Sequence, residues 1–313
     1  SGRARLPTGA SCDTMPTMDH EPRICDYEDS TYRTDFWEGQ GREYEDLAER
    51  IALRHLLPPP GGRLIDIGGG FGRLSEFYDG YEQVILLDYS RSLLRQAQAR
   101  LGRSERMVYV AASFYDMPFA DNALDVAMMV RVIHHVERVP ALLGEVARVL
   151  AGGGSYLLEF ASKRHLKSIL RYALGRQAWN PFDREPVEFV EMNYDFHPDW
   201  MREHLREAMF HVKHTRTVSH FRLPLLKKAI PANLLAAVDG ICQPTGAWWQ
   251  LTPSVFVQCE NGKGPGNAPA GQLFRCPSCH GSDLEESTGA LVCQGCGARW
   301  PIEDGIYNFK AEP

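Results

Sequence analysis

The feature that most constrains the fold is the alternation of short apolar runs with helical periods between residues 63 and 160. Parallel strands need a crossover connection, usually a helix, so strands and helices that alternate along a chain form a mainly parallel sheet. The sequence therefore predicts an α/β fold with helices on both faces of the sheet. The expected strands are 63–67, 84–88, 107–111, 124–130 and 155–160, and the expected helices are 72–78, 90–101 and 139–150.

Further elements flank this core. An apolar period that begins near Tyr44 predicts a helix, and the three prolines at 58–60 stop it. After the core we expect a basic helix at 163–176, a capped helix from about Asp199, and strands at 211–220 and 255–259. These elements predict one domain over 23–260, with inserts at about 161–198 and 222–253. Residues 1–22 mix Gly, Pro, Ser and Thr without periodicity, so we expect a disordered or tag-like stretch.

A glycine-rich turn, "RLIDIGGGFGRL", follows the first expected strand. Such a turn lets a ligand approach the backbone closely and points amide groups toward it. A dinucleotide fingerprint would need a third glycine at position 73, where this chain has arginine. The turn therefore predicts a ligand site, and the arginine disfavours a nicotinamide or flavin dinucleotide.

The spacing of Asp66, Gly68, Gly70 and Gly72 resembles motif I of the class I S-adenosylmethionine-dependent methyltransferases. Two later stretches, "ASFYDMPFADNALDVAMMVRVIHHV" and "ARVLAGGGSYLLEF", resemble the branch of that family that includes quinone-biosynthesis methyltransferases. The resemblance covers about residues 40–160. It implies a Rossmann-like sheet of seven strands that binds S-adenosylmethionine.

The resemblance also implies which residues hold the cofactor. Asp88 stands where the family has an acid that accepts hydrogen bonds from both ribose hydroxyls. Ser113 replaces the usual aspartate that accepts a hydrogen bond from the adenine amino group, and Phe114 would offer its backbone amide to the ring. Tyr89 is placed to pack on the adenine.

Three more residues complete the implied cofactor set. Arg42 and Tyr44 are candidates to reach over the methionine carboxylate, and surface pairing is the alternative role for both. Arg131, just after the fourth expected strand, is the third.

Two adjacent histidines are the candidates for catalysis. His134 and His135 follow the fourth expected strand, at the carboxyl edge of the sheet where ligands bind in such folds. Either could accept a proton near neutral pH. The alternative is that one packs against the cofactor and the other is structural. Glu159, Tyr194 and His197 are weaker candidates.

Four cysteines near the end of the chain have the spacing of a zinc site. Cys276 and Cys279 form one CxxC pair, and Cys293 and Cys296 form a second pair after thirteen intervening residues. Four thiolates close a tetrahedral shell, so the expected zinc is structural and leaves no position for a substrate. A disulfide or an iron–sulfur cluster is the alternative.

The cysteine-rich region 274–313 resembles a small zinc-ribbon protein that activates several tRNA, rRNA and protein methyltransferases, notably in the run "PIEDGI". The resemblance implies that a zinc ribbon is fused here to its enzyme. Residues 261–273 are rich in Gly and Pro and would serve as a linker that lets the ribbon dock back. A partner protein that binds through the ribbon is the alternative use.

Charge distribution leaves the methyl acceptor open. Residues 161–230 hold 13 Lys and Arg against 8 Asp and Glu, whereas the whole chain has a net charge of −6. A basic segment and a zinc ribbon favour a tRNA or rRNA acceptor. The branch of the motifs and the apolar, aromatic inserts favour a small or lipid-like acceptor, which is the first hypothesis. A non-catalytic cofactor-binding scaffold is the third.

Location is predicted from what the sequence lacks. No run of eighteen apolar residues is present, and the first residues contain no apolar segment of the signal-peptide type. The scattered remaining cysteines do not form a secreted disulfide framework. We therefore expect a cytoplasmic protein without a transmembrane segment.

Overall fold

A computed structural model describes residues 22–29 and 41–310. Its centre is a sheet in which five parallel strands have the spatial order β3-β2-β1-β4-β5. β9 pairs antiparallel with β5, and β8 pairs antiparallel with β9. The bounds are β1 (Arg63–Ile67), β2 (Gln83–Asp88), β3 (Met107–Ala111), β4 (Leu124–Met129), β5 (Leu150–Ala161), β8 (Phe210–Val218) and β9 (Ser254–Asn261). The predicted Rossmann-like sheet is confirmed.

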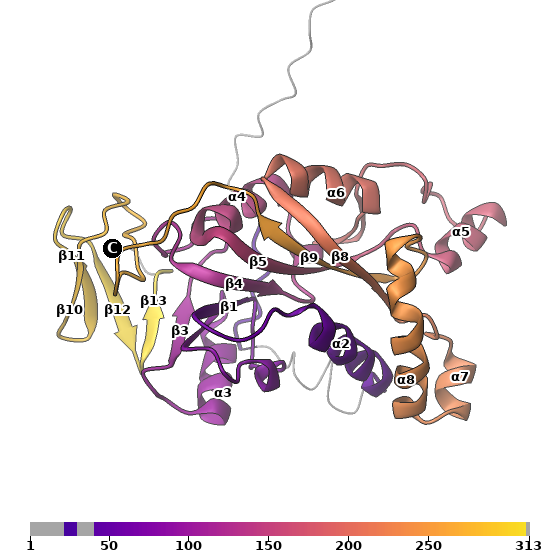
Figure 1. Ribbon diagram of the computed structural model, residues 1–313, viewed down its shortest axis with the longest axis horizontal. Coiled ribbons are helices and arrows are strands. Elements are labelled where there is room, and N and C mark those ends of the chain that lie inside the picture. Colours follow the sequence, from indigo (N-terminus) through magenta and orange to yellow (C-terminus); the bar gives the residue numbers. More distant parts are fainter. Residues whose placement is uncertain (1–21, 30–40, 311–313) are drawn as a thin grey trace, which may run out of the picture.

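Helices cover both faces of this sheet (Figure 1). Successive strand residues point to opposite faces, so Leu64 belongs to one apolar cluster and Ile65 to the other. α4 (Val139–Val149) and α6 (Pro198–Glu207) pack on the face of Ile65. α2 (Glu43–Leu56), α3 (Arg91–Leu101) and α8 (Ala232–Cys242) pack on the face of Leu64.

The helix expected at 72–78 is wrong. Only a single 3₁₀ turn, η1 (Ser75–Phe77), is present there. Gly72 has φ +73°, a left-handed conformation that cannot begin an α-helix. The chain then turns back at Gly80, so it has no length for more than one helical turn before β2.

The two inserts form small elements at one end of the molecule (Figure 1). The first contains the expected basic helix, α5 (Leu166–Ala173), and a hairpin of β6 (Val187–Val190) and β7 (Asn193–Asp195). The second contains α7 (Pro224–Ala229), α8 and the 3₁₀ turn η3 (Gln243–Ala247). The cap of α6 is His197 rather than Asp199, because the His197 imidazole accepts a hydrogen bond from the Asp199 amide.

The cysteine-rich region extends the central sheet, which therefore has eleven strands instead of the seven expected. Its four strands are β10 (Leu284–Ser287), β11 (Ala290–Cys293), β12 (Arg299–Glu303) and β13 (Ile306–Asn308). β13 pairs parallel with the edge strand β3, in the register Ile306 to Tyr109. The segment 261–273 lies along the sheet domain, where the Ala268 amide donates to the Asn122 carbonyl. The region thus covers an edge of the sheet that would otherwise be open.

Within the described residues, none of the helices is both long and apolar enough to cross a bilayer.

Candidate functional site

The glycine turn after β1 forms one wall of a pocket at the carboxyl edge of the sheet. Gly68 has φ +72° and Gly70 has φ +51°, values that side chains with a Cβ rarely adopt. A Cβ on Gly70 would lie 3.8 Å from both the Asp88 carboxylate and the Leu93 side chain. A side chain there would therefore take up pocket space.

Asp88 ends β2 on the opposite wall. Its Oδ2 accepts a hydrogen bond of 2.9 Å from the Gly70 amide, and its Oδ1 accepts one of 2.8 Å from the Ser90 amide. Burial raises the pKa of Asp88 to about 6. Each carboxylate oxygen carries two lone pairs, so each keeps one acceptor position for a ligand hydroxyl.

The rest of the pocket wall comes from β2, from α3, from the segments that follow β3 and β4, and from the segment 22–29. Tyr89, Phe114 and Arg131 line it, as expected. Ser113 is not among the lining residues, and its hydroxyl accepts a hydrogen bond from the Tyr115 amide. The pocket is lined by Cys25, Tyr27, Gly68, Gly70, Leu87, Asp88, Tyr89, Leu93, Ala112, Phe114, Arg131, Val132 and His135.

Asp66 and Gly72 support the glycine turn instead of lining the pocket. The Asp66 carboxylate is buried under the turn and accepts a hydrogen bond of 2.5 Å from the Tyr78 hydroxyl. Burial raises the pKa of Asp66 to about 7. A Cβ on Gly72 would lie 2.9 Å from the Leu101 side chain, so this glycine permits close packing against α3.

The structure brings Arg42 to the site but not Tyr44. Arg42 lies directly before α2 and lines a second cavity, which adjoins the pocket. Tyr44 is buried, and its hydroxyl donates to Asp239 and accepts from the Phe221 amide. Tyr44 therefore ties α2 to α8.

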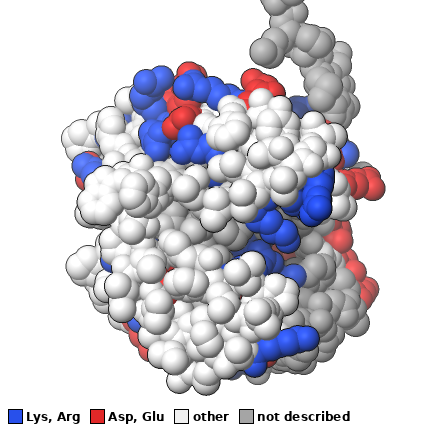
Figure 2. Space-filling view, turned by 90° about the vertical axis from the view of Figure 1, so that its right-hand side faces the viewer, with Lys and Arg blue, Asp and Glu red and all other residues white. Residues whose placement is uncertain are grey.

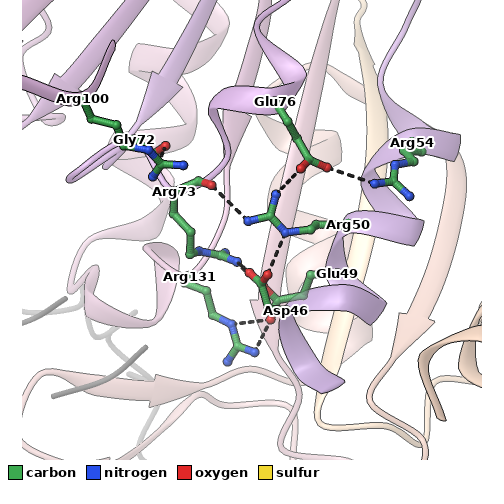
Figure 3. A network of polar contacts seen from close by, with 9 residues as sticks. All are labelled: Asp46, Glu49, Arg50, Arg54, Gly72, Arg73, Glu76, Arg100 and Arg131. Carbon is green, nitrogen blue, oxygen red and sulfur yellow. Dashed lines mark hydrogen bonds and ion pairs between the residues drawn. The ribbon is translucent and has the colours of Figure 1, made fainter. Parts of the chain in front are cut away.

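A network of ion pairs fixes α2 to the glycine turn (Figure 3). The fully buried Glu49 carboxylate binds the Arg73 guanidinium at 3.0 Å and the Arg131 guanidinium at 2.8 Å. Arg73 also pairs with Asp46, and Arg50 donates to the Arg73 carbonyl. The arginine that interrupts the dinucleotide fingerprint thus has a structural role, which the sequence alone did not indicate.

A second cavity, of about 600 Å³, adjoins the pocket. We call it the chamber. It shares Tyr27, Arg131 and His135 with the pocket wall, and both expected catalytic histidines line it. The chamber is lined by Tyr27, Arg42, Arg131, His134, His135, Glu159, Ala161, Ser162, His165, Phe189, Val190, Asn193, Asp195, Arg222, Pro253 and Ser254.

The two histidines differ in their surroundings. His135 Nδ1 lies 2.7 Å from the Met192 carbonyl, which can only accept, so Nδ1 carries the proton. His135 Nε2 then accepts from the Tyr27 hydroxyl at 3.1 Å. Burial lowers the pKa of both histidines, and the pKa of His134 falls well below its usual value. Both side chains are therefore neutral at pH 7.

Two carboxylates face the chamber. Both Glu159 oxygens are engaged, by the Ser254 hydroxyl at 2.7 Å and by the Arg131 amide at 3.0 Å. Asp195 makes no hydrogen bond through its carboxylate within the described residues, and burial raises its pKa to about 6. The Ser162 hydroxyl is also buried without a partner among those residues. The chamber thus offers polar groups that are free to bind a ligand.

The other two weaker candidates do not line the chamber. His197 is buried as the cap of α6, and the Tyr194 hydroxyl accepts a hydrogen bond from Arg23. Tyr27 and Asp195 also line the chamber, although the sequence did not predict them as site residues. Neither lies in a recognisable motif, and only the folding of segment 22–29 and of the β6–β7 hairpin brings them to the site.

The four predicted cysteine ligands come together in the cysteine-rich region. Their sulfur atoms all lie within 4.8 Å of one another. Cys276 Sγ is 3.7 Å from Cys296 Sγ, and Cys279 Sγ is 3.5 Å from Cys293 Sγ. A zinc–sulfur bond of about 2.3 Å places the sulfurs of a tetrahedron about 3.8 Å apart, so the cluster has the size of a zinc site.

Comparisons with known proteins relate the sheet domain to methyltransferases. The family described as "Methyltransferase domain" matches residues 65–158. A ubiquinone/menaquinone biosynthesis C-methyltransferase of Roseobacter denitrificans is 33% identical over 37% of this chain and 49% of its own length. A 24-methylenesterol C-methyltransferase of Oryza sativa is 33% identical over 37% of this chain and 33% of its own length. The chain thus spans half or less of the length of these relatives.

Two solved structures have a similar fold. One is a complex between the Haloferax volcanii Trm112 methyltransferase activator and a methyltransferase, with a TM-score of 0.52, 16% identity and coverage of 74% of this chain and 96% of that one. The other is an S-adenosylmethionine dependent methyltransferase of Listeria monocytogenes, with a TM-score of 0.51, 18% identity and coverage of 70% and 99%. The chain therefore shares the Rossmann-like fold of these structures, and its residues 65–158 match the methyltransferase domain family.

Proposed function

We propose that the protein transfers a methyl group from S-adenosylmethionine to a small or lipid-like acceptor. One observation carries the proposal: the pocket between the glycine turn and Asp88 adjoins a chamber that contains unpaired polar groups. The pocket suits a cofactor, and the chamber suits its acceptor.

The residues of the pocket fit S-adenosylmethionine. Asp88 would accept hydrogen bonds from the two ribose hydroxyls through its remaining lone pairs, while the Gly70 and Ser90 amides keep it oriented. The Tyr89 and Phe114 rings offer apolar surface for the adenine. Arg42 and Arg131, from the chamber side, would hold the carboxylate of the methionine part. When bound, the cofactor supplies a methyl group on a positively charged sulfur, which an oriented nucleophile can attack without further activation.

The chamber residues would orient the acceptor and remove its proton where the chemistry needs it. His134 and His135 are the expected candidates, but Tyr27 occupies His135 Nε2. Asp195 joins His134 as a candidate base, because its carboxylate is unpaired within the described residues and is mostly ionised at pH 7.

Two further observations favour a small or lipid-like acceptor. The C-methyltransferases among the relatives act, by their names, on quinone precursors and a sterol. The chamber wall also includes the apolar side chains of Phe189, Val190 and Pro253. An RNA acceptor is the second candidate, favoured by the excess of Lys and Arg in 161–230.

The cysteine-rich region would be a structural zinc ribbon. Four thiolates fill the coordination shell, and the cluster lies in a small apolar core of its own with Leu291 and Trp300. The proposed role is to complete the sheet beside β3, with no direct part in methyl transfer.

A labelling experiment separates the acceptor classes. The purified protein is incubated with extracts and S-adenosylmethionine that carries a radioactive methyl group, and the organic-soluble and RNA fractions are counted. We expect the label in the organic-soluble fraction. Label in RNA would select the second candidate, and no transfer despite cofactor binding would favour a non-catalytic scaffold.

A further inference from the structure

A third cavity, which we call the outer pocket, continues from the chamber toward the end of the molecule that carries α5, α7 and α8. With about 1030 Å³ it is larger than the chamber. The two cavities share five wall residues, so they adjoin each other and follow one another away from the pocket at the glycine turn. The shared residues are His165, Phe189, Asp195, Arg222 and Pro253.

The wall of the outer pocket combines large apolar side chains with the basic side chains of Lys167, Arg171, Arg176 and Arg222. Leu166, Leu170 and Leu174 contribute to it from α5 and its end, and Leu223 and Trp249 from the second insert. The Ser219 hydroxyl, which is also in the wall, is buried and has no hydrogen-bond partner within the described residues. A cavity with large apolar side chains and an unpaired hydroxyl fits a molecule with a long apolar part and polar groups.

The surface around the opening is also apolar. Large side chains are exposed on α7, on α8 and after η3, and Leu225, Ile241 and Trp248 each expose 78% or 79% of their surface. Figure 2 shows this end of the molecule, with a broad area of uncharged residues and groups of Lys and Arg around it. Several large apolar side chains exposed on neighbouring elements are typical of an interaction site.

Basic residues outnumber acidic ones at this end, where the exposed acidic residues Asp183, Glu185, Glu188 and Glu191 precede or belong to the β6–β7 hairpin. No Asp or Glu occurs in residues 160–182, and Asp239, which is buried, is the one acidic residue in 208–259. Lys167, Arg171, Arg176 and Lys228 are exposed and form no ion pair with any of the residues that the structure describes. The surface therefore combines the two features that attract a protein to an anionic bilayer, apolar side chains that insert and basic side chains that meet lipid head groups.

We propose that the α5–α7–α8 end docks on an anionic membrane surface, so that the outer pocket opens toward the lipid from which the acceptor comes. RNA is less suited to this surface, because its most exposed residues include aliphatic side chains that cannot stack on bases. The inference deepens the proposed function and rests on it for the identity of what passes through the pocket. The docking itself does not depend on methyl transfer.

The test is sedimentation of the full chain with vesicles, without cofactor. One vesicle preparation contains phosphatidylglycerol and phosphatidylcholine in equal parts, and the other contains phosphatidylcholine alone. We expect binding to the anionic vesicles that weakens as salt is added. The double variant Lys167→Gln/Arg171→Gln should bind about 30-fold more weakly, since each basic residue near an anionic surface contributes about fivefold.

Matched variants separate charge from apolar insertion. Arg95→Gln/Arg299→Gln removes two exposed charges from α3 and the ribbon, away from this end, and should leave vesicle binding unchanged. Ile241→Ser/Trp248→Ser removes apolar groups that do not line the outer pocket, and should weaken binding about 10-fold or more.

Three outcomes would overturn the proposal. The first is no binding to anionic vesicles. The second is RNA binding that Lys167→Gln/Arg171→Gln abolishes while vesicles are not bound. The third is a dimer that Ile241→Ser/Trp248→Ser dissociates, with no vesicle binding. Calorimetry with S-adenosylhomocysteine on the same samples keeps the two proposals apart, because docking could fail while cofactor binding is intact.

Discussion

At the scale of single residues, the proposed chemistry of the chamber is tested most sharply at Asp195, one of its two candidate bases. Its carboxylate lies where the chamber meets the outer pocket, and burial raises its pKa to about 6. A base with this pKa is protonated and inactive below pH 6 and becomes ionised above it. The rate of methyl transfer should therefore rise as the pH passes through about 6.

Replacement of this carboxylate tests the assignment. Asp195→Asn should lower kcat by about 100-fold or more and remove the rise near pH 6, because an amide cannot accept the proton. Its affinity for S-adenosylmethionine should stay the same, since Asp195 does not line the cofactor pocket. A variant that keeps both kcat and the rise near pH 6 would show that Asp195 is not the base.

Several site residues could be predicted from the sequence because they sit in local patterns. The glycine turn and Asp88 follow β1 and β2 directly, and the sheet brings them to one edge. Tyr44 could not be placed, because an amphipathic helix does not reveal which neighbour its buried face will meet. In the fold that neighbour is Asp239 of α8, 195 residues away along the chain.

At the scale of elements, the position of the glycine turn depends on how α2 is held against it. Glu49 is fully buried and is shared by Arg73, from the turn, and Arg131, which follows β4. Glu49→Ala would leave these two guanidiniums without their buried partner. We expect it to lower the free energy of unfolding by about 3–5 kcal/mol.

A surface carboxylate of the same network is the control. Glu76 pairs with Arg50 and Arg54 but is 41% exposed. Glu76→Ala should cost about 1 kcal/mol or less in chemical denaturation. Equal effects of the two variants would show that the buried pairs do not hold α2 in place.

The strands of the parallel sheet were easier to predict than the 3₁₀ turn η1 between β1 and β2. Each strand of the parallel sheet is a short apolar run, because it is buried on both faces. Residues 72–78 also show an apolar period, but the left-handed Gly72 and the short distance to β2 allow only η1. Backbone geometry here overrides the periodicity.

At the scale of the whole molecule, the cysteine-rich region and the methyltransferase domain share one sheet. The sequence indicated that the region could dock back, but not where, because edge pairing uses backbone groups that any sequence provides. In the structure β13 joins β3, and the Lys310 ammonium lies 3.8 Å from the centre of the Tyr89 ring. The region therefore contacts Tyr89, a residue of the pocket wall, through the Lys310 side chain.

Metal removal tests the role of the region. A chelator, or the variant Cys293→Ser, should unfold β10–β13, since so small an apolar core depends on its metal. The edge of β3 would then be open, and the protein should aggregate at concentrations where the native protein is soluble. Cys242→Ser, outside the cluster, is the control. A metal-free protein that keeps its solubility would contradict the structural role of zinc.

S-adenosylmethionine is proposed to bind between the glycine turn and Asp88, and calorimetric titration with S-adenosylhomocysteine measures that binding. We expect one site per chain, a loss of about 1–3 kcal/mol of binding free energy in Asp88→Ala, and no loss in Asp79→Ala, whose side chain is exposed. Absence of binding to the folded native protein, or equal affinity in Asp88→Ala, would contradict this proposal.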